Sequence, residues 1–579
     1  MIRQITREFS KMFFKIMFDK RFIFLLIVSL IAYRSPELFL YPRFWAEEAT
    51  LYFKSIYESS IFEGLFFIPR YTAEYITLSV NIPLTLAARL FPIEYAPAVS
   101  TYFSFLILLI PFGIVLWGNS HLWDTPIKKF LACLIILLAP TSTDAEIWLN
   151  TINLQIYCGI ISVCLLFEKL DPQSLSQRKR WLYRLLLIFC GLSGPYTMFL
   201  SLAFLLKAWY EKSRESLWFF LIVFLTSSVQ ATLFLIINHL DMVSPTKISQ
   251  FDWIKAPIYI FNYHLMTPLL GLWVRLGANV EDFMITGKLQ GALLLMVCLA
   301  TIITTAIVLY FLTKNRTSIY RLILLVAFLS VSLLTTYGSM RGVPYGRYAV
   351  IPGILFLLLI LDNVHFSWKL DFKSLFLLTL LGISLVMGFS TFKAKEYWMA
   401  YIEGTPKWTD EMAQWKQNPD HLIASWPFPW HDSSWKFYLS HQNLMKDFKE
   451  RIQATDKFQL VSQNGEWAEK TIEVNGLPID FHFIFIALVT GDTKTFQAKI
   501  TCLDEHNESC GQYSITKALN QRTHTILDFY SLDRRTQPHT KVIERYQVAK
   551  KLVFRLKSNT STSLEISDLK ITRQKMAVF

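Results

Sequence analysis

The feature that most constrains this chain is a series of apolar runs that recurs from the N-terminus to about residue 391 and then stops. Each run approaches the roughly 20 residues that a helix needs to cross a bilayer. Charged residues make up only 17% of the sequence, well below the roughly 25% of ordinary soluble domains. We therefore expect an α-helical polytopic membrane protein over residues 1–391, followed by a polar region of domain size.

The apolar runs predict about eleven spans. The first is an uncleaved helix over 22–33, and two short spans meet at Gly191–Pro195 within 184–207. The others are expected near 95–117, 128–141, 152–168, 217–238, 290–312, 321–337, 347–361 and 373–391. Residues 60–91 are broken by Pro83 and carry Asn81 and Arg89. We interpret them as surface or re-entrant helices, because broken backbone at membrane depth is tolerated where protein covers it.

The positive residues indicate how the chain crosses the membrane. Lysines and arginines cluster before the first span, at 128–129, over 169–184 and over 207–214, which are all on one side in this arrangement. Cytoplasmic loops carry such an excess. We therefore expect a bacterial inner membrane protein with a cytoplasmic N-terminus and a periplasmic or extracellular C-terminal domain. The net charge of +13 does not form one stripe, so nucleic acid is not an expected partner.

The polar tail divides into two parts. Residues 392–457 are rich in tryptophan, which indicates a juxtamembrane linker whose rings form an interfacial belt or, alternatively, stack on sugars. Residues 458–579 contain period-2 alternation at 479–486, 496–502, 551–557 and 564–571. This pattern predicts a small antiparallel β-sandwich.

Two of the seven cysteines lie in this tail. Cys502 and Cys510 have a spacing that could close a hairpin disulfide, which would place the tail in an oxidising compartment. The other five lie inside apolar runs, where a small buried thiol is expected.

The candidate chemistry begins directly after the first span. Glu47 and Glu48 are adjacent carboxylates between aromatic rings, and ionisable groups next to a membrane are costly unless solvated, paired or used. In one interpretation, one carboxylate is a general base, or orients an acceptor hydroxyl, for displacement at a sugar anomeric carbon, and its like-charged neighbour raises its pKa. In the other, the pair is a solvated loop end.

The order of elements resembles the GT-C superfamily of polyprenyl-phosphate-dependent membrane glycosyltransferases. More narrowly, four short motifs are similar to a group of bacterial multi-pass proteins identified as glucosyltransferases. The motifs are Phe44-Trp45-Ala46-Glu47-Glu48 with Tyr71, Thr151-Ile-Asn153-Leu-Gln155, Gly194-Pro195-Tyr196 and Gly346-Arg347-Tyr348. That group usually has Trp-Ala-Glu-Asp-Gly, whereas this chain has Glu48 and Ala49 at the last two positions.

The resemblance implies that Glu47 or Glu48 activates the acceptor. Arg70, Arg341 and Arg347 are expected on the same outer face, where their guanidinium groups would suit a lipid-linked phosphate. The substrate-binding candidates have alternative interpretations. The polar residues could cap span ends, the arginines could snorkel, and the histidine could be interfacial. The substrate-binding candidates on the same outer face are Arg70, Tyr71, Glu74, Asp144, Asn150, Asn153, Gln155, Tyr196, His264, Arg341, Tyr345, Arg347 and Tyr348.

We therefore expect an integral membrane glycosyltransferase that binds membrane lipid, a polyprenyl-phosphate sugar donor and a glycan or lipid acceptor. No Gly-rich phosphate loop or zinc-ligand spacing is present. No bound cofactor is expected, and a divalent metal requirement stays open. The alternatives are a lipid-glycan transporter or flippase and a non-catalytic scaffold. The transferase requires Glu47 or Glu48 to converge with Arg341 or Arg347 in one outward-facing pocket.

Overall fold

The structure is a computed structural model that divides into two units. Residues 1–56 and 64–400 form the first unit, and residues 57–63 and 401–579 form the second. The described residues are 19–69, 75–143, 145–171, 175–239, 252–271, 291–313, 318–339, 343–344, 346–366, 371–393, 406–418, 421, 423–426, 436–437, 439, 459–462, 467–478, 483–491, 495–503, 509–518, 524–527, 548–558 and 564–573.

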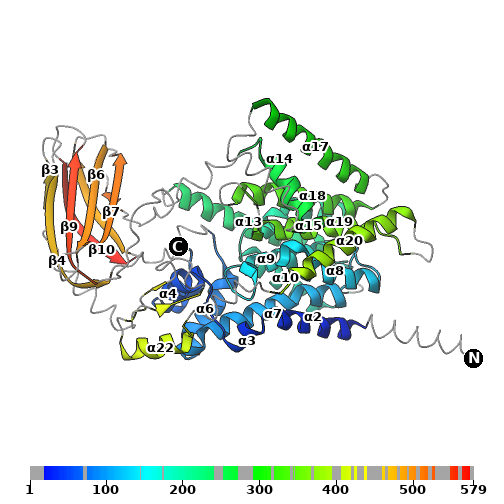
Figure 1. Ribbon diagram of the computed structural model, residues 1–579, viewed down its shortest axis with the longest axis horizontal. Helices are drawn as coiled ribbons and strands as arrows, with labels where there is room; N and C mark the ends of the chain where they lie inside the picture. Colours follow the sequence, from blue (N-terminus) through cyan, green and yellow to red (C-terminus); the bar gives the residue numbers. More distant parts are fainter. Residues whose placement is uncertain are drawn as a thin grey trace, which may run out of the picture. The chain divides into compact units, whose positions relative to one another are not determined.

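The first unit is helical (Figure 1). Its longer helices are α2 (Lys20–Arg34), α6 (Leu78–Leu90), α7 (Ala96–Trp117), α8 (Pro126–Leu138), α9 (Leu154–Leu166), α10 (Gln177–Gly191), α12 (Ser201–Glu211), α13 (Arg214–His239), α17 (Gly291–Thr313), α18 (Ile319–Gly338), α19 (Val350–Asp362) and α20 (Phe372–Ser390). Its shorter helical segments include α3 (Pro36–Leu40), η1 (Glu48–Phe53), η4 (Ala145–Ile147), α11 (Tyr196–Phe199), α14 (Ala256–Tyr259), η5 (Ile260–Met266), α15 (Thr267–Leu270) and η7 (Gly346–Ala349).

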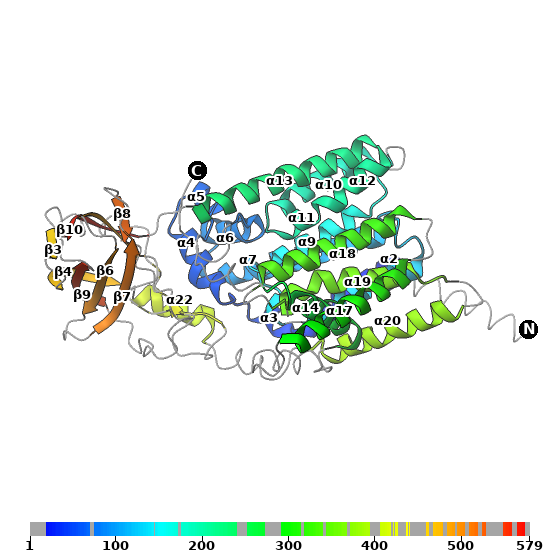
Figure 2. The ribbon, with the colours of Figure 1, turned by 90° about the horizontal axis from the view of Figure 1, so that it is seen from above.

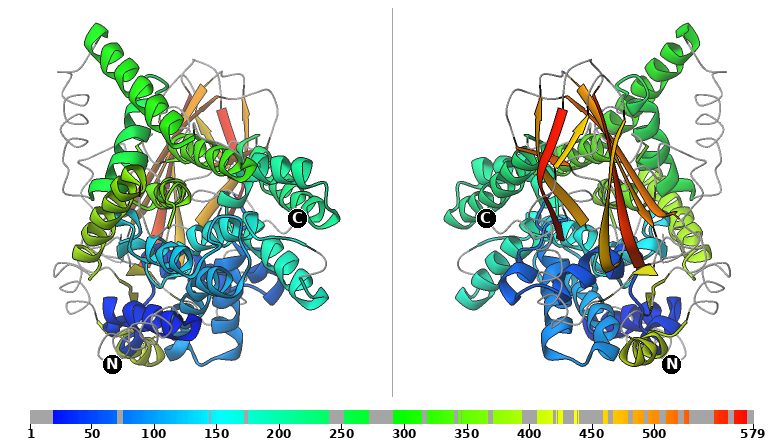
Figure 3. Two further views of the ribbon diagram at one scale, coloured as in Figure 1. Left: turned by 90° about the vertical axis from the view of Figure 1, so that its right-hand side faces the viewer. Right: turned by 90° about the vertical axis from the view of Figure 1, so that its left-hand side faces the viewer.

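A membrane-embedded helical protein is confirmed at this level. Among the described residues, five helices are long and apolar enough to cross a bilayer: Ile93–Trp117, Arg214–Ile236, Leu293–Thr313, Ile319–Gly338 and Phe372–Ser390. Each coincides with an expected span. The other expected spans are shorter helices, so the total of about eleven crossings stays a prediction. Of the five, α17 is the least covered by other helices and lies at the edge of the unit (Figure 3).

Helix starts are of two kinds. The first turns of α2, α8, α10, α13, α18 and α20 contain lysine or arginine, whereas those of α7, α9, α12, α17 and α19 contain neither.

Contacts join the basic helix starts to the ends of neighbouring helices. Lys129 in α8 donates through Nζ to the carbonyl of Leu116 in α7 (3.2 Å). Lys179 in α10 lies 3.4 Å from Glu168, which follows α9, and Arg321 in α18 pairs with Asp362 in α19 at 2.5 Å. The starts of α8, α10 and α18 therefore lie at the same end of the bundle as the ends of α7, α9 and α19. We call it the basic end.

Helix α9 forms the core of this unit. All twelve residues from Leu154 to Leu166 other than Gln155 are buried. It packs against α6, α7, α10, α11, α12 and α19. Figure 2 shows α10, α12 and α13 side by side at one edge of the bundle, in agreement with the contacts of α13 with both other helices.

The second unit contains two four-stranded antiparallel sheets. One has the order β3 (Gln459–Ser462), β10 (Leu564–Arg573), β5 (Phe483–Gly491), β8 (His524–Leu527). The other has the order β4 (Ala468–Pro478), β9 (Val548–Ser558), β6 (Thr495–Leu503), β7 (Ser509–Ala518). The alternation at 496–502, 551–557 and 564–571 lies within β6, β9 and β10, and 479–486 overlaps the start of β5.

The tryptophans that follow the last span have a different place from the one expected. Trp408 and Trp415 on α22 (Trp408–Gln417), and Trp426 after β1 (Ile423–Ala424), are buried. The Nε1–H of Trp415 donates to the carbonyl of Leu439 (2.7 Å), and its ring contacts that of Tyr57. All three rings are buried in protein, so the surface belt expected for them is wrong.

Candidate functional site

Glu48 is completely buried and saturated with hydrogen bonds. It accepts from the backbone N–H groups of Trp45 (2.9 Å) and Thr151 (2.8 Å) and from the hydroxyls of Ser100 and Thr151. Burial raises the pKa of Glu48, and these four donors oppose that shift. Its carboxylate therefore ties the acidic loop to the start of α7 and to the turn before α9.

The two loops that Glu48 joins both contain left-handed backbone. Ala46 has φ = 43° and Leu149 has φ = 50°. A non-glycine residue in this region is uncommon and carries strain, which persists only where the surroundings impose it. The hydrogen bonds of Glu48 supply such a constraint, because one loop lies directly before it and the other directly before Thr151.

Asn150 and Asn153 are buried and fold the second loop. The Nδ2 groups of both donate to the carbonyl of Glu146 (2.7 and 2.8 Å), and Asn150 Oδ1 accepts from the backbone N–H of Asn153 (3.1 Å). These bonds lie within residues 146–153 and hold the start of α9. The geometry thus favours the capping alternative for this pair.

Glu47 differs from its neighbour. Its side chain is half-buried and accepts no hydrogen bond from the residues that the structure describes. Electrostatic interactions link it to Arg347 and to Tyr52. With no direct partner among the described residues, this carboxylate is available to a further hydroxyl or cation.

Arg347 is the guanidinium group that the structure brings to this carboxylate. Its Nη1 pairs with Glu146 Oε1 at 2.6 Å, and its Nη2 donates to the hydroxyl of Tyr348 (3.4 Å). The side chains of Arg347 and Glu146 are 26% and 34% exposed, so solvent reaches both. Residues near the start and near the end of the helical unit therefore meet at one place.

Tyrosines surround the two charges. Tyr196, at the start of α11, is buried and interacts electrostatically with Tyr75, Tyr348 and Arg347. Tyr75 donates through its hydroxyl to Gln155 Oε1 (3.0 Å). Two predicted residues, Tyr196 and Tyr348, thus interact with Arg347, and Gln155 is joined to the same group through Tyr75.

His264 lies on the π-helix η5. It is completely buried, and neither ring nitrogen has a partner of hydrogen-bond geometry within the described part of the chain, although the backbone of Pro344 lies close by. Burial lowers the pKa of His264 to about 3. The imidazole is therefore neutral at ordinary pH.

Several predicted residues lie outside the described residues: Arg70, Tyr71, Glu74, Asp144, Arg341 and Tyr345. In the second unit, Cys502 in β6 lies opposite Gly511 in β7, next to Cys510. The hairpin is therefore present, and the disulfide stays a prediction. The five cysteines expected as buried thiols, Cys133, Cys158, Cys164, Cys190 and Cys298, are buried and free.

Sequence reasoning missed the residues that hold Glu48. Ser100 and the role of Thr151 carried no signal, because a serine and a threonine at helix starts are common caps. Tyr52 was also missed. It follows the Glu48 carboxylate by one helical turn, and this spacing was the signal that could have identified it.

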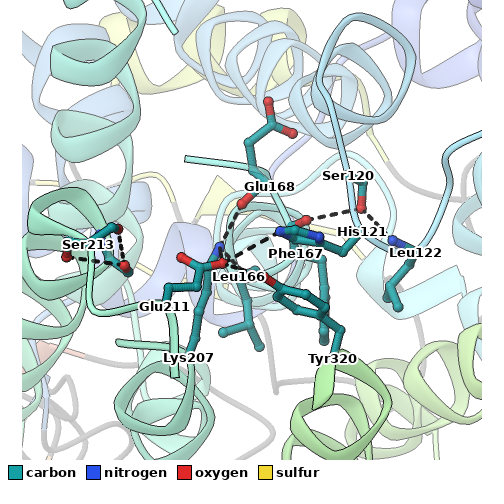
Figure 4. Close-up of polar contacts among 11 residues, drawn as sticks. Ser120, His121, Leu122, Leu166, Phe167, Glu168, Lys207, Glu211, Ser213 and Tyr320 are labelled. Atoms are coloured by element: carbon teal, nitrogen blue, oxygen red, sulfur yellow. Dashed lines mark hydrogen bonds and ion pairs between the residues drawn. The ribbon is translucent and has the colours of Figure 1, made fainter. Parts of the chain in front are cut away.

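A second polar cluster lies at the basic end (Figure 4). Glu211 accepts from the hydroxyl of Tyr320 (2.9 Å) and lies 3.5 Å from His121, whose ring stacks on Tyr320. The buried Lys207 donates through Nζ to the carbonyls of Leu166 (2.8 Å) and Glu168 (2.6 Å). Lys207, Glu211, His121 and Tyr320 are thus paired with one another or with backbone carbonyls, so the cluster joins the ends of α9 and α12 to the start of α18.

No protein-family model matches the sequence, and no curated protein is similar to it. Within the described residues, no group of three or more His, Cys, Asp or Glu side chains is arranged to hold a metal ion.

Proposed function

We propose that this protein is an integral membrane glycosyltransferase that transfers a sugar from a polyprenyl-phosphate donor to a glycan or lipid acceptor outside the cytoplasm. The observation that supports this proposal most is the meeting of Glu47 with the Arg347–Glu146 pair and its tyrosines.

In this proposal, Glu47 rather than Glu48 activates the acceptor. Glu48 already accepts four hydrogen bonds from the protein. Glu47 has none from the described residues, so an acceptor hydroxyl can donate to it. Removal of the hydroxyl proton as the oxygen attacks the anomeric carbon, with the polyprenyl phosphate leaving, inverts the configuration at that carbon.

Arg347 is proposed to bind the donor phosphate. Guanidinium groups present a planar fork of donors that fits phosphate oxygens. Its present pairing with Glu146 leaves it about one quarter exposed, and the nearby carboxylate can hold the fork in place while a phosphate approaches. The neighbouring tyrosines offer hydroxyls and ring faces to a sugar.

The membrane orientation is part of the proposal. Lysines and arginines occupy the first turns of α2, α8, α10, α13, α18 and α20. Positive residues mark the cytoplasmic side, and Ser100, Thr151 and Arg347 precede or begin helices of the other kind. The proposed arrangement has Glu47 on the outer side of a protein of about eleven spans, and the two sheets as an extracytoplasmic sandwich.

The test is sugar transfer by matched glutamine variants in the full-length protein. Glu47→Gln is expected to lower kcat/KM by about 100-fold or more, the contribution typical of a general base. Arg347→Lys keeps the charge but loses the fork, and is expected to raise the KM for the lipid donor by about 10-fold or more. Full transfer by Glu47→Gln would contradict the proposal.

A further inference from the structure

A surface at the basic end combines a cluster of cations with exposed tryptophans. It is formed by the start of α10, the end of α12 and the start of α13. Residues 177–191 and 201–216 contain seven basic side chains and two carboxylates. The seven are Arg178, Lys179, Arg180, Arg184, Lys207, Lys212 and Arg214.

Glu215 fixes the geometry of this surface. It accepts from Arg184 with both oxygens (2.8 Å each) and from Arg180 (3.2 Å). These bonds hold the first turns of α10 and α13 together. Arg178 and Arg214 belong to these same two first turns.

Two guanidinium groups still bind one carboxylate, so the triad keeps a net positive charge. Arg178, Lys212 and Arg214 are exposed and have no ion pair with a described residue. The buried Nε–H groups of Arg180 and Arg184 likewise have no acceptor in the described part of the chain. The first turn of α10 contains no acid, and a cluster of cations there is disfavoured by the helix dipole. An external anion would supply the missing charge.

Exposed tryptophans lie on the same three helices. The guanidinium carbon of Arg184 lies 5.0 Å from the ring centroid of Trp181 and 5.5 Å from that of Trp218. Trp181, Trp209 and Trp218 are 54%, 70% and 41% exposed. Tryptophan rings concentrate at the headgroup level of a bilayer. The anion that these cations meet is therefore held at that level, as a phospholipid phosphate is.

We propose that this surface, the α10–α13 basic surface, binds the headgroup of an anionic phospholipid in the leaflet at the basic end. The phosphate lies among Arg178, Lys212 and Arg214, and the acyl chains run along the exposed apolar faces of α10 and α13. The proposal does not depend on the proposed transferase activity, since its readout is lipid binding.

The test is native mass spectrometry of the full-length protein with phosphatidylglycerol or phosphatidylcholine added. The wild-type protein is expected to bind phosphatidylglycerol more tightly. A basic residue near a membrane surface contributes about fivefold in binding. The triple variant Arg178→Gln/Lys212→Gln/Arg214→Gln is therefore expected to lose at least that factor for phosphatidylglycerol and to bind phosphatidylcholine as before.

Two controls complete the design. Lys470→Gln/Lys517→Gln/Lys557→Gln removes three charges from the second unit and is expected to keep the lipid preference. Arg178→Lys/Arg214→Lys retains the charges and is expected to keep it as well. Equal binding of the two lipids by the wild-type protein, or a full preference in the triple glutamine variant, would overturn the proposal.

Discussion

At the scale of single residues, the adjacent carboxylates Glu47 and Glu48 have different environments. The side chain of Glu48 holds two loops through four hydrogen bonds, whereas that of Glu47 holds none that the described residues provide. Adjacent carboxylates of similar appearance in the sequence thus differ completely in environment. The difference lies in their partners, because Trp45, Ser100 and Thr151 all donate to the second carboxylate.

Glu48→Gln is expected to destabilise the protein by about 2–4 kcal/mol. The amide NH₂ would face the backbone N–H of either Trp45 or Thr151, which leaves that buried donor without an acceptor. Thermal unfolding in detergent measures the loss. Glu47→Gln is the matched control and should unfold as the wild-type protein does. Equal stability of both variants would show that the hydrogen bonds of Glu48 do not hold these loops.

His264 predicts an acid-sensitive stability. Its pKa is lowered to about 3 from the ordinary 6.5, so the folded state binds this proton less readily than the unfolded state. The contribution is fully present above pH 6.5 and is lost as pH falls toward 3. Between pH 6.5 and 5 the expected loss is about 2 kcal/mol.

The check is unfolding as a function of pH. His264→Phe should flatten the slope between pH 6.5 and 5, because no group remains to be protonated there. His365→Gln replaces an exposed histidine and should leave the slope unchanged. An unaltered slope in His264→Phe would mean that its ring is hydrated and titrates normally.

At the scale of the elements, α20 approaches the end of α8 closely at Gly388. A Cβ added to Gly388 would overlap the carbonyl oxygen of Leu138, whereas one added to Gly382 on the same helix would meet nothing within 4 Å. Small residues allow such backbone approach between membrane helices. Gly388→Ala should therefore force the helices apart.

The paired alanine variants test this contact. Gly388→Ala is expected to lower the stability by about 1–3 kcal/mol, the usual cost of overpacking. Gly382→Ala should be neutral or stabilising by up to about 1 kcal/mol, because alanine favours a helix interior. Unfolding in detergent compares them, and similar values for both would contradict the close approach.

The sequence predicted the long helices well because length and hydropathy decide them. The expected span 95–117 is α7, and 217–238 lies within α13. It could not predict the contacts of α8 with α20 or of Glu48 with Thr151, because both depend on residues far apart in the chain. The same limit explains Trp415. Its burial depends on Leu439 and Tyr57, and a local count of tryptophans indicates only an interface.

For the whole molecule, the proposed orientation makes opposite predictions at the two ends. The native cysteines described as free are buried, so an introduced thiol can be labelled selectively. With a membrane-impermeant maleimide and sealed vesicles of known orientation, Tyr41→Cys should react from the outer side. Lys212→Cys should react only after the vesicles are opened. The reverse labelling pattern would place Glu47 on the cytoplasmic side of the membrane.

The short length of α9 bears on the depth of the proposed site below the lipid headgroups. Its 13 residues rise by about 20 Å, whereas the hydrocarbon layer is about 30 Å thick. Thr151 just before it and Glu168 just after it cannot both reach the water on either side. At least one of these polar layers is therefore below the lipid headgroups. If it is the layer at Thr151, the proposed lipid-linked donor would meet Glu47 within the membrane rather than above it.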